Sequence, residues 1–265
     1  MWNNAKKSER FIPQFGEFWV IEKSCPVTSL TANRGISKIT VLANTVIFLD
    51  QTREEVKMPD KTITQEKILE SAKTEFLEKG FLNASLRNIV KNAGVTTGAF
   101  YRYYDSKEAL FEAIVGEHAQ YVLALFCHTI DQFEELPGQE QTEQMLELST
   151  DCMGEMLDYV YEHHDAFKLL VEYADGTRYT DFIHKLVEKE VESTYFYIET
   201  LERMGHKMEP INKNLIHMIA SGQFTGIFEV IVHDMPKEEA IEYATQMRRF
   251  YAAGWSELMN IQFGR

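Results

Sequence analysis

Polar, aromatic and basic side chains gather in one short stretch, residues 85–110, with the sequence SLRNIVKNAGVTTGAFYRYYDSKEAL. Hydroxyl groups of serine, threonine and tyrosine can bind phosphate oxygens, and arginine can donate two hydrogen bonds to the edge of a guanine. Between residues 79 and 107 five basic side chains accompany a single acid, Asp105, which gives a local charge of +4. This composition is suited to a small surface that binds DNA, even though the whole chain carries −14.

Ten positions in this stretch are candidates for contact with DNA. Arg102 is the best candidate for base recognition, because a bidentate arginine–guanine contact contributes roughly 1–3 kcal/mol of discrimination. Gly98 would let the DNA backbone approach closely, and Lys107 would reach a phosphate. The predicted contact residues are Ser85, Arg87, Thr96, Thr97, Gly98, Ala99, Tyr101, Arg102, Tyr103 and Lys107.

Two short helices must position these side chains. Ser85 can cap a helix over 85–93, and Gly94 follows where the chain needs a left-handed turn residue. Thr96 or Thr97 can then cap a second helix with the sequence GAFYRYY. The apolar spacing predicts a helix-turn-helix whose second helix enters the major groove. Its expected core is Leu86, Ile89, Val90, Val95, Phe100 and Tyr104.

The remaining pattern from residue 58 onward is helical, which predicts an all-α fold. An amphipathic helix over 62–80 precedes the helix-turn-helix, and a long helix from Ser106 to about Phe133 follows it. Glycine, proline and aspartate interrupt the later periodicity. Further helices are expected at about 139–163, 165–174, 179–205, 211–233 and 236–261.

The order EFLEKGF, then SLRNIVKNAGVTTGAFYRYYDSKEAL, closely resembles the DNA-binding domain of TetR-family (tetracycline-repressor-like) regulators, over about 64–112. The resemblance implies a three-helix DNA-binding domain within 58–112, then a helical effector-binding and dimerisation domain within 113–265. It also implies a repressor of transcription that binds inverted-repeat operator DNA and is released by a small-molecule effector. The homodimer would form through helices 211–233 and 236–261. By this resemblance Thr96, Thr97, Gly98, Tyr101, Tyr103 and Lys107 fall on DNA-contacting positions, and Arg102 falls where members vary.

Such a regulator needs an apolar cavity with a few polar groups, so some aromatic side chains of the second domain should line it, although most are core by default. Residues 116–265 carry a net charge of −16, which suggests a lipophilic cation held by carboxylate and cation–π contacts. Solubility and repulsion of this domain from DNA explain the excess acid equally well. The candidate effector-binding residues are Phe126, Tyr159, Phe167, Glu172, Tyr173, Phe182 and Tyr195.

Two other functions are compatible with parts of the sequence. The same DNA-binding module could serve a transcriptional activator or a regulator without an effector. An enzyme or metal site could use His163 and His164, but adjacent helical side chains diverge and no HExxH motif or spaced Cys/His set supports them. Three separated cysteines suggest reduced thiols. We therefore expect no enzymatic activity, no metal and no cofactor.

The first 57 residues lack helical periodicity, and we expect a non-native or disordered extension. A weak strand pattern allows a hairpin between 17–22 and 38–49. Codons for Glu54 to Met58 can contain a ribosome-binding sequence shortly before an ATG, so native translation is expected to begin at Met58. The longest apolar run, 41–49, is too short to span a membrane, which favours a cytoplasmic protein.

Overall fold

The computed structural model describes residues 39–42, 45–48 and 60–263. The chain divides into two compact units, Met1–Lys57 and Met58–Arg265, which we describe separately. Most of the expected N-terminal extension, and the junction at Met58, lie outside the described residues.

The described part of the first unit is a two-stranded antiparallel hairpin. Strand β1 (Ile39–Leu42) pairs with β2 (Thr45–Phe48), so that Ile39 lies opposite Phe48. Both strands fall inside the segment 38–49, which was expected to pair as a whole with 17–22. Within the described residues the two halves of this segment pair with each other, and residues 17–22, the other side of the expected hairpin, lie outside the described residues.

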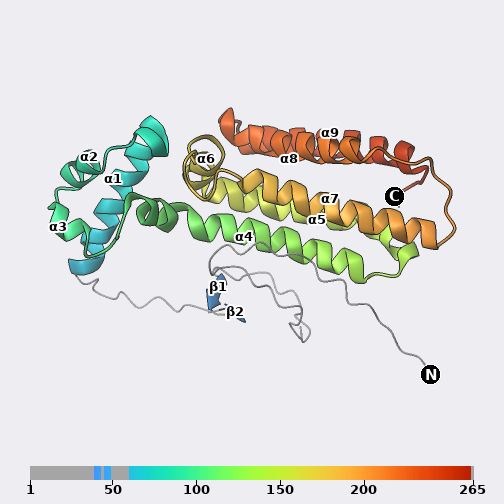
Figure 1. Ribbon diagram of the computed structural model, residues 1–265, viewed down its shortest axis with the longest axis horizontal. Coiled ribbons are helices and arrows are strands. Elements are labelled where there is room, and N and C mark those ends of the chain that lie inside the picture. The colour runs from blue at the N-terminus through green and yellow to red at the C-terminus, as the bar shows by residue number, and fades with distance from the viewer. Residues whose placement is uncertain (1–38, 43–44, 49–59, 264–265) are drawn as a thin grey trace, which may run out of the picture. The chain divides into compact units, whose positions relative to one another are not determined.

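The described part of the second unit contains only helices as regular structure, which confirms the all-α prediction (Figure 1). The boundaries agree with the expected ones to within a few residues at nearly every helix end. The helices are α1 (Asp60–Asn83), α2 (Leu86–Asn92), α3 (Thr97–Phe100), α4 (Lys107–Glu135), α5 (Gly138–Glu162), α6 (His164–Glu172), α7 (Phe182–Arg203), α8 (Lys213–Val232) and α9 (Lys237–Met259).

Local hydrogen bonds explain where the helices of the DNA-binding region begin and end. Ser85, Thr96 and Ser106 each accept a hydrogen bond from the backbone N–H three residues later, as N-caps do. Gly80 interrupts α1 with a φ of 69°, and Gly94 makes the turn after α2 with a φ of 68°. These glycines set the angles between α1, α2 and α3.

Helix α3 is shorter than predicted, because it ends at Phe100 and not at Tyr104. The N–H groups of Arg102 and Tyr103 bond to carbonyls only three residues earlier, those of Ala99 and Phe100. The chain therefore tightens into turns that lead to the start of α4, and Arg102 lies on a turn instead of a helix.

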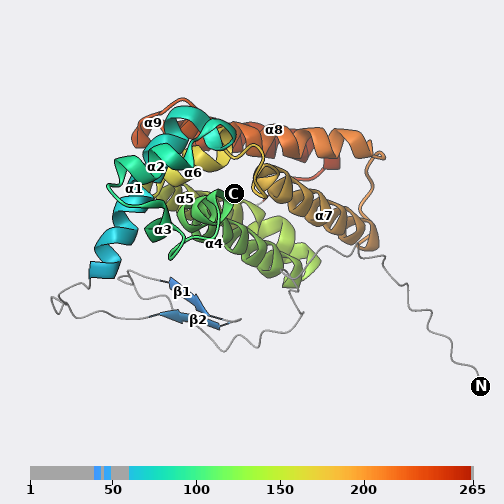
Figure 2. The same cartoon turned by 60° about the vertical axis from the view of Figure 1, so that its left-hand side comes forward.

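Helices α1, α2 and α3 form one end of the second unit, and α4 leads from this end along α5 and α7 (Figures 1 and 2). Helix α8 packs on α7, and α9 packs on α5 and α8. One buried cluster extends from α1 through α4 to α9, so the two ends share a continuous core. Helices α4 and α8 are long and apolar enough to cross a membrane, a test that core helices of globular proteins also pass.

Candidate DNA interface and ligand cavity

The turn from α3 towards α4 presents its polar side chains outward. Thr96, Thr97, Gly98 and Arg102 are exposed, and the Tyr101 side chain is 52% exposed. Beneath them Phe100 is fully buried, with its ring centroid 5.8 Å from that of Tyr104. The apolar side of this element therefore anchors it, while the opposite side stays available for a ligand.

The other predicted contact residues differ in exposure. Arg87 is exposed on α2, whereas Ser85, Ala99 and Tyr103 are half-buried. A Cβ atom added at Gly98 would meet nothing within 4 Å, so packing inside the protein does not require glycine there. Close approach of an external molecule would give glycine a role at this position.

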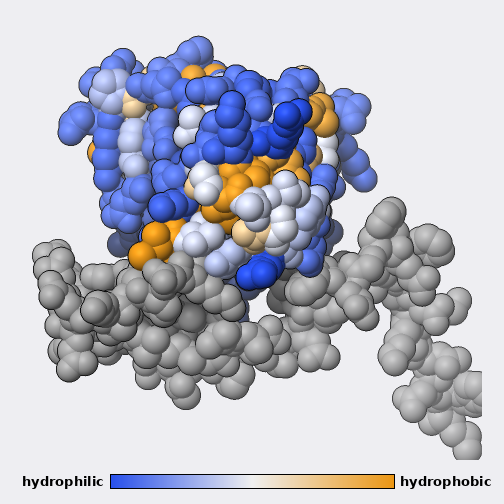
Figure 3. All heavy atoms as spheres, turned by 90° about the vertical axis from the view of Figure 1, so that its left-hand side faces the viewer, coloured by the Kyte–Doolittle hydropathy of each residue, from blue (hydrophilic) through white to orange (hydrophobic). Residues whose placement is uncertain are grey.

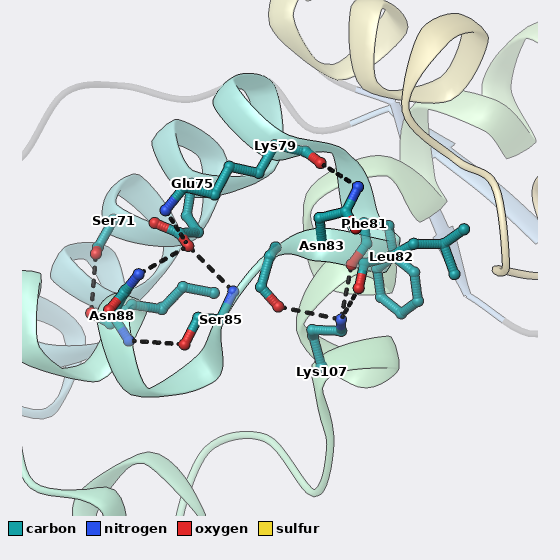
Figure 4. Close-up of polar contacts among 11 residues, drawn as sticks. Ser71, Glu75, Lys79, Phe81, Leu82, Asn83, Ser85, Asn88 and Lys107 are labelled. Atoms are coloured by element: carbon teal, nitrogen blue, oxygen red, sulfur yellow. Dashed lines mark hydrogen bonds and ion pairs between the residues drawn. The ribbon is translucent and has the colours of Figure 1, made fainter.

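Lys107, for which a phosphate contact is predicted, is hydrogen-bonded within the protein. Its Nζ donates hydrogen bonds to the carbonyl oxygens of Phe81 (2.7 Å), Leu82 (3.4 Å) and Ala84 (3.2 Å), and lies 4.4 Å from the centre of the Phe81 ring (Figure 4). These carbonyls follow the break at Gly80 and lack the partners that a continuous helix would supply. Lys107 thus joins the start of α4 to the end of α1.

A buried carboxylate fixes α2 against α1. Glu75 is only 3% exposed, and its Oε1 accepts hydrogen bonds from Lys79 Nζ (2.8 Å), Ser85 N (3.1 Å) and Asn88 Nδ2 (3.2 Å) (Figure 4). The hydrogen bond from Lys79, with those from Ser85 and Asn88, holds the pKa of Glu75 below its ordinary value despite burial. The Ser71 hydroxyl adds a hydrogen bond to the Ile89 carbonyl (2.9 Å).

The surface at this end of the molecule is mainly hydrophilic and surrounds a limited apolar patch (Figure 3). Exposed apolar or aromatic side chains on α1, on the segment after Gly80 and beside α3 are Ile63, Leu82 and Tyr101. A polar surface with basic side chains is suited to a polyanion.

A cavity of about 150 Å³ lies at the other end of the unit, lined by α4, α5, α7, α8, α9 and the residues that follow α9. Its lining is mainly aromatic and aliphatic, with several methionines and a few polar side chains. The lining residues are Phe126, Thr129, Ile130, Phe133, Met145, Leu148, Ser149, Cys152, Met153, Met156, Glu190, Ser193, Thr194, Tyr197, Gln223, Phe224, Ile227, Trp255, Met259 and Phe263.

Among the described lining residues, Glu190 is the one whose side chain carries an ionisable carboxyl group. Burial raises the pKa of Glu190 to about 7. Among the described residues no hydrogen bond or ion pair to its carboxyl group is found, and no Lys, Arg or His of this part lines the cavity. The cavity thus combines an apolar wall with one unpaired acid.

The DNA-binding end also has a recognisable sequence relationship. Residues 68–114, from within α1 to within α4, match the family model described as bacterial regulatory proteins, tetR family. The chain carries a TetR-family DNA-binding domain. The predicted resemblance is confirmed for this segment, which contains α2, α3 and the exposed turn.

Curated relatives match mainly through the same TetR-family domain. The chain is 40% identical over 96 residues to the HTH-type transcriptional regulator YvdT of Bacillus subtilis, which covers 36% of this chain and 46% of that protein. It is 37% identical over 68 residues to UidR of Escherichia coli, covering 26% of this chain and 35% of that protein. The chain thus spans less than half the length of these relatives.

A solved structure, the transcriptional regulator FadR from Bacillus subtilis in complex with stearoyl-CoA, gives a TM-score of 0.47 at 14% identity. The superposition covers 71% of this chain and 98% of that chain.

Of the seven predicted effector-binding residues, only Phe126 lines the cavity. Phe167 and Phe182 are buried in the core, where both rings contact Phe228. Glu172 and Tyr173 lie at the end of α6, and the Tyr173 carbonyl accepts a hydrogen bond from Phe81 N (3.1 Å). Phe167, Glu172 and Tyr173 belong to α6 or its end, and α6 contributes no residue to the cavity lining, whereas Phe182 lies at the start of α7, in the core and away from the part of that helix that lines the cavity.

Tyr159 and Tyr195 also lie elsewhere. The Tyr159 ring stacks on Tyr121, and its hydroxyl lies 3.0 Å from His118 Nδ1. Burial raises the pKa of Tyr159 to about 12 and lowers the pKa of His118 to about 4. His163 stacks on His118, and Tyr195 is half-buried on α7 near Lys213.

Glu190 escaped the sequence analysis, although a signal for it exists. Val187, Thr194 and Tyr197 lie on one buried face of α7, and Glu190 falls on the same face, three residues after Val187 and four before Thr194. Its neighbours Glu188 and Glu192 are exposed, so the excess of acids in this helix conceals the one that faces inward. A single acid on an otherwise buried stripe is the signal that could have identified it.

Proposed function

We propose that this protein is a DNA-binding transcriptional regulator, a cytoplasmic repressor that leaves an inverted-repeat operator when a small-molecule effector occupies the cavity. The observation that carries the proposal is the course of α4. Its first residue, Lys107, contacts the end of α1, and its last turns supply Phe126, Ile130 and Phe133 to the cavity wall. One rigid element therefore connects the DNA-binding domain with the candidate effector site.

The exposed turn of α3 supplies the DNA-contacting groups. Arg102 would donate two hydrogen bonds to a guanine, while Thr97 and Tyr101 hydroxyls would bind phosphate or sugar oxygens. Arg87 would add a phosphate contact from α2. Because the Lys107 ammonium already bonds three carbonyls, we assign it a supporting role and not a phosphate contact.

A second connection supports coupling between the two ends. Glu112 on α4 accepts a hydrogen bond from the Tyr179 hydroxyl (2.6 Å) and pairs with Arg178, both from the segment that precedes α7. An effector that displaces α7 or α4 would alter these contacts and tilt the DNA-binding domain. Release requires the effector to bind the non-DNA-binding state more tightly.

The proposed partner is a second copy of the chain, joined through α8 and α9. Large apolar side chains remain exposed on these helices, including Met218 (68%) and Phe250 (73%). Gly222 and Gly226 of α8 face Tyr251 and Met247 of α9 in the same chain, so they serve packing between these two helices. A dimer would place two recognition turns on two half-sites of the operator.

An activator, or a regulator without an effector, would use the same DNA-binding domain. The cavity favours the effector-responsive form, since a tightly packed helical domain has few voids larger than a water molecule.

Fluorescence anisotropy with DNA from upstream of the protein's own coding region tests the proposal, at two salt concentrations. The expected result is salt-sensitive binding of a dimer, with Arg102→Ala losing roughly 1–3 kcal/mol of discrimination at one base pair. Tyr101→Phe should weaken binding without changing base preference. Arg203→Ala, which removes the same charge from an exposed site at the end of α7, is the matched control.

Binding no tighter than to random DNA, together with failure of a genome-wide selection to find any site, would contradict the regulator hypothesis. Unchanged base preference in Arg102→Ala would remove only the assignment of that residue.

A further inference from the structure

The cavity contains an acid that the fold leaves without a partner. Glu190 belongs to α7, and the nearest cation along the chain, Lys189, pairs with Glu192 at 2.8 Å on the exposed side of the helix. Folding thus places a half-buried carboxyl group beside apolar walls, and no hydrogen-bond donor among the described residues compensates for the part of its hydration that is lost. An unpaired acid in such a position is unfavourable unless a bound molecule compensates for it.

The walls around this acid are suited to a cation with an apolar body. Phe126, Phe133, Tyr197, Phe224 and Trp255 contribute aromatic rings, whose faces attract positive charge. The methionines of α5 contribute flexible, polarisable thioethers that adapt to an irregular ligand.

We propose that the cavity binds a small organic cation, an ammonium group carrying an aromatic or branched aliphatic body, and that the charge of this ligand pairs with Glu190. The proposal names the effector class for the regulator proposed above. Binding to the cavity can nevertheless be measured without DNA.

Other ligand classes fit the lining less well. An anion would meet the Glu190 carboxylate and would find no Lys, Arg or His among the described lining residues. A neutral ligand could accept a hydrogen bond from the protonated acid, but would leave the ionised form uncompensated above neutral pH. A cation compensates for that form directly.

The cavity volume limits the size of the ligand. About 150 Å³ is comparable with an engineered apolar cavity that accommodates benzene. The ligand in this conformation is therefore of the size of one ring with a compact charged group. Larger cations would require the surrounding helices to move, which is the kind of change that the proposed release from DNA needs.

The pH dependence of binding follows from the titratable groups that face the cavity. The described lining contains Cys152 of α5 and Tyr197 of α7 besides Glu190, and none from α4, α8 or α9. Burial raises the pKa of Cys152 and of Tyr197, so both stay neutral near pH 7. Glu190 alone ionises there, and cation affinity should increase as the pH rises through about 7.

Equilibrium dialysis of the full-length protein can test this with two probes of nearly equal shape. Benzyltrimethylammonium keeps its charge at every pH, and neopentylbenzene replaces its nitrogen with carbon. We expect the cation to bind about tenfold or more tightly at about pH 8 than at about pH 5.5, and the neutral probe to bind equally at both. Binding of the cation should exceed that of the neutral probe at the higher pH.

Glu190→Gln keeps the shape of the side chain and removes its charge. It should weaken cation binding at about pH 8 by about tenfold or more and abolish the pH dependence. Glu199→Gln removes an equal charge from an exposed position on the same helix and should bind as the unmodified protein does.

Three results would each overturn the assignment: equal affinity for the two probes, cation binding that does not change with pH, or cation binding that Glu190→Gln leaves intact. Fluorescence anisotropy with operator DNA, measured on the same preparation, distinguishes failure of the cation assignment from failure of the regulator hypothesis. Operator binding without cation binding would remove only the ligand class, whereas cation binding without any operator would remove only the regulator function.

Discussion

Two glutamates of this chain, the buried Glu75 and the half-buried Glu190, have opposite surroundings. Glu75, in the DNA-binding domain, receives hydrogen bonds from Lys79, Ser85 and Asn88, and its pKa lies below the ordinary value. Glu190, in the cavity, has no such donor among the described residues, and burial raises its pKa to about 7. The same side chain therefore stabilises the fold at one site and opposes it at the other.

This difference separates structural from ligand-binding uses of a carboxylate. A group whose hydrogen bonds are complete within the protein adds rigidity and has little left to offer a ligand. A group that remains incomplete makes the unliganded state less stable, and a ligand that supplies the missing charge is bound more tightly for that reason. Removing each carboxylate should therefore have opposite effects on stability.

The largest effect is expected from Glu75→Ala. The substitution leaves the Ser85 N–H and the Asn88 amide without their acceptor and removes the partner of Lys79. Leaving a donor without its acceptor in the protein interior costs about 1–3 kcal/mol, so the loss of the acceptor of both groups should destabilise the protein by about 3–5 kcal/mol. Urea denaturation measures the free energy of unfolding, and Glu78→Ala, an exposed position on the same helix, is the control.

A Glu75→Ala protein as stable as the control would mean that the carboxylate does not hold α2 against α1. Glu75 would then not be an example of a carboxylate that stabilises the fold, in contrast to Glu190.

The second prediction concerns how the contribution of Glu190 to the free energy of unfolding changes with pH. Since its pKa rises from an ordinary 4.5 to about 7 on folding, the folded state binds the extra proton, and stability is lost as the pH rises between these values. Relative to Glu190→Gln, the unmodified protein should lose roughly 2–3 kcal/mol of unfolding free energy between about pH 5 and about pH 8.

Denaturation of both proteins at the two pH values gives this difference directly. Glu199→Gln should show no such change relative to the unmodified protein. A constant difference between Glu190→Gln and the unmodified protein would show that Glu190 is ionised or protonated equally in the folded and unfolded chains.

The DNA-binding half of the comparison was predictable from local sequence. Caps at Ser85, Thr96 and Ser106, and the left-handed turn at Gly94, depend on neighbours within a few residues, so spacing alone locates α2, α3 and the start of α4. The partners of Lys107 were not predictable, because they lie more than twenty residues away, after a break in α1.

The cavity depends on contacts of longer range still. Five helices and the residues after α9 line it, and periodicity shows which face of each helix is apolar but not which faces leave a space between them. Phe126 and Phe167 are both aromatic residues on helices, yet one lines the cavity and the other is fully buried in the core. Packing of complete side chains determines that difference.

A third prediction concerns Lys107, the cation whose hydrogen bonds, like those of Glu75, are completed within the protein. Lys107→Met should destabilise the protein by about 1–2 kcal/mol, because three carbonyls lose a charged donor while the aliphatic part of the side chain is kept. The salt dependence of DNA binding should stay unchanged, since no phosphate contact is lost. Denaturation and anisotropy at several salt concentrations measure the two quantities.

A reduced salt dependence in Lys107→Met would show instead that the ammonium reaches a phosphate in the complex. The sequence-based assignment would then hold for the bound state, and the carbonyl contacts would belong to the free protein. Lys91→Met, which removes an exposed charge from α2, provides the comparison for a general loss of basic charge.

The smallest effect is expected from Lys79→Met, which tests how far the low pKa of Glu75 depends on its ion pair with Lys79. The Lys79 side chain is 40% exposed, and exposed ion pairs contribute little, so Lys79→Met should cost about 0.5–1 kcal/mol. Two donors would remain on the carboxylate, and the pKa of Glu75 should rise towards its ordinary value without reaching the behaviour of Glu190. Carboxyl-carbon NMR titration of Glu75 would measure this shift. A rise to near 7 would mean that the ammonium alone distinguishes the two acids, whereas a small rise would assign most of the difference to the backbone and amide donors.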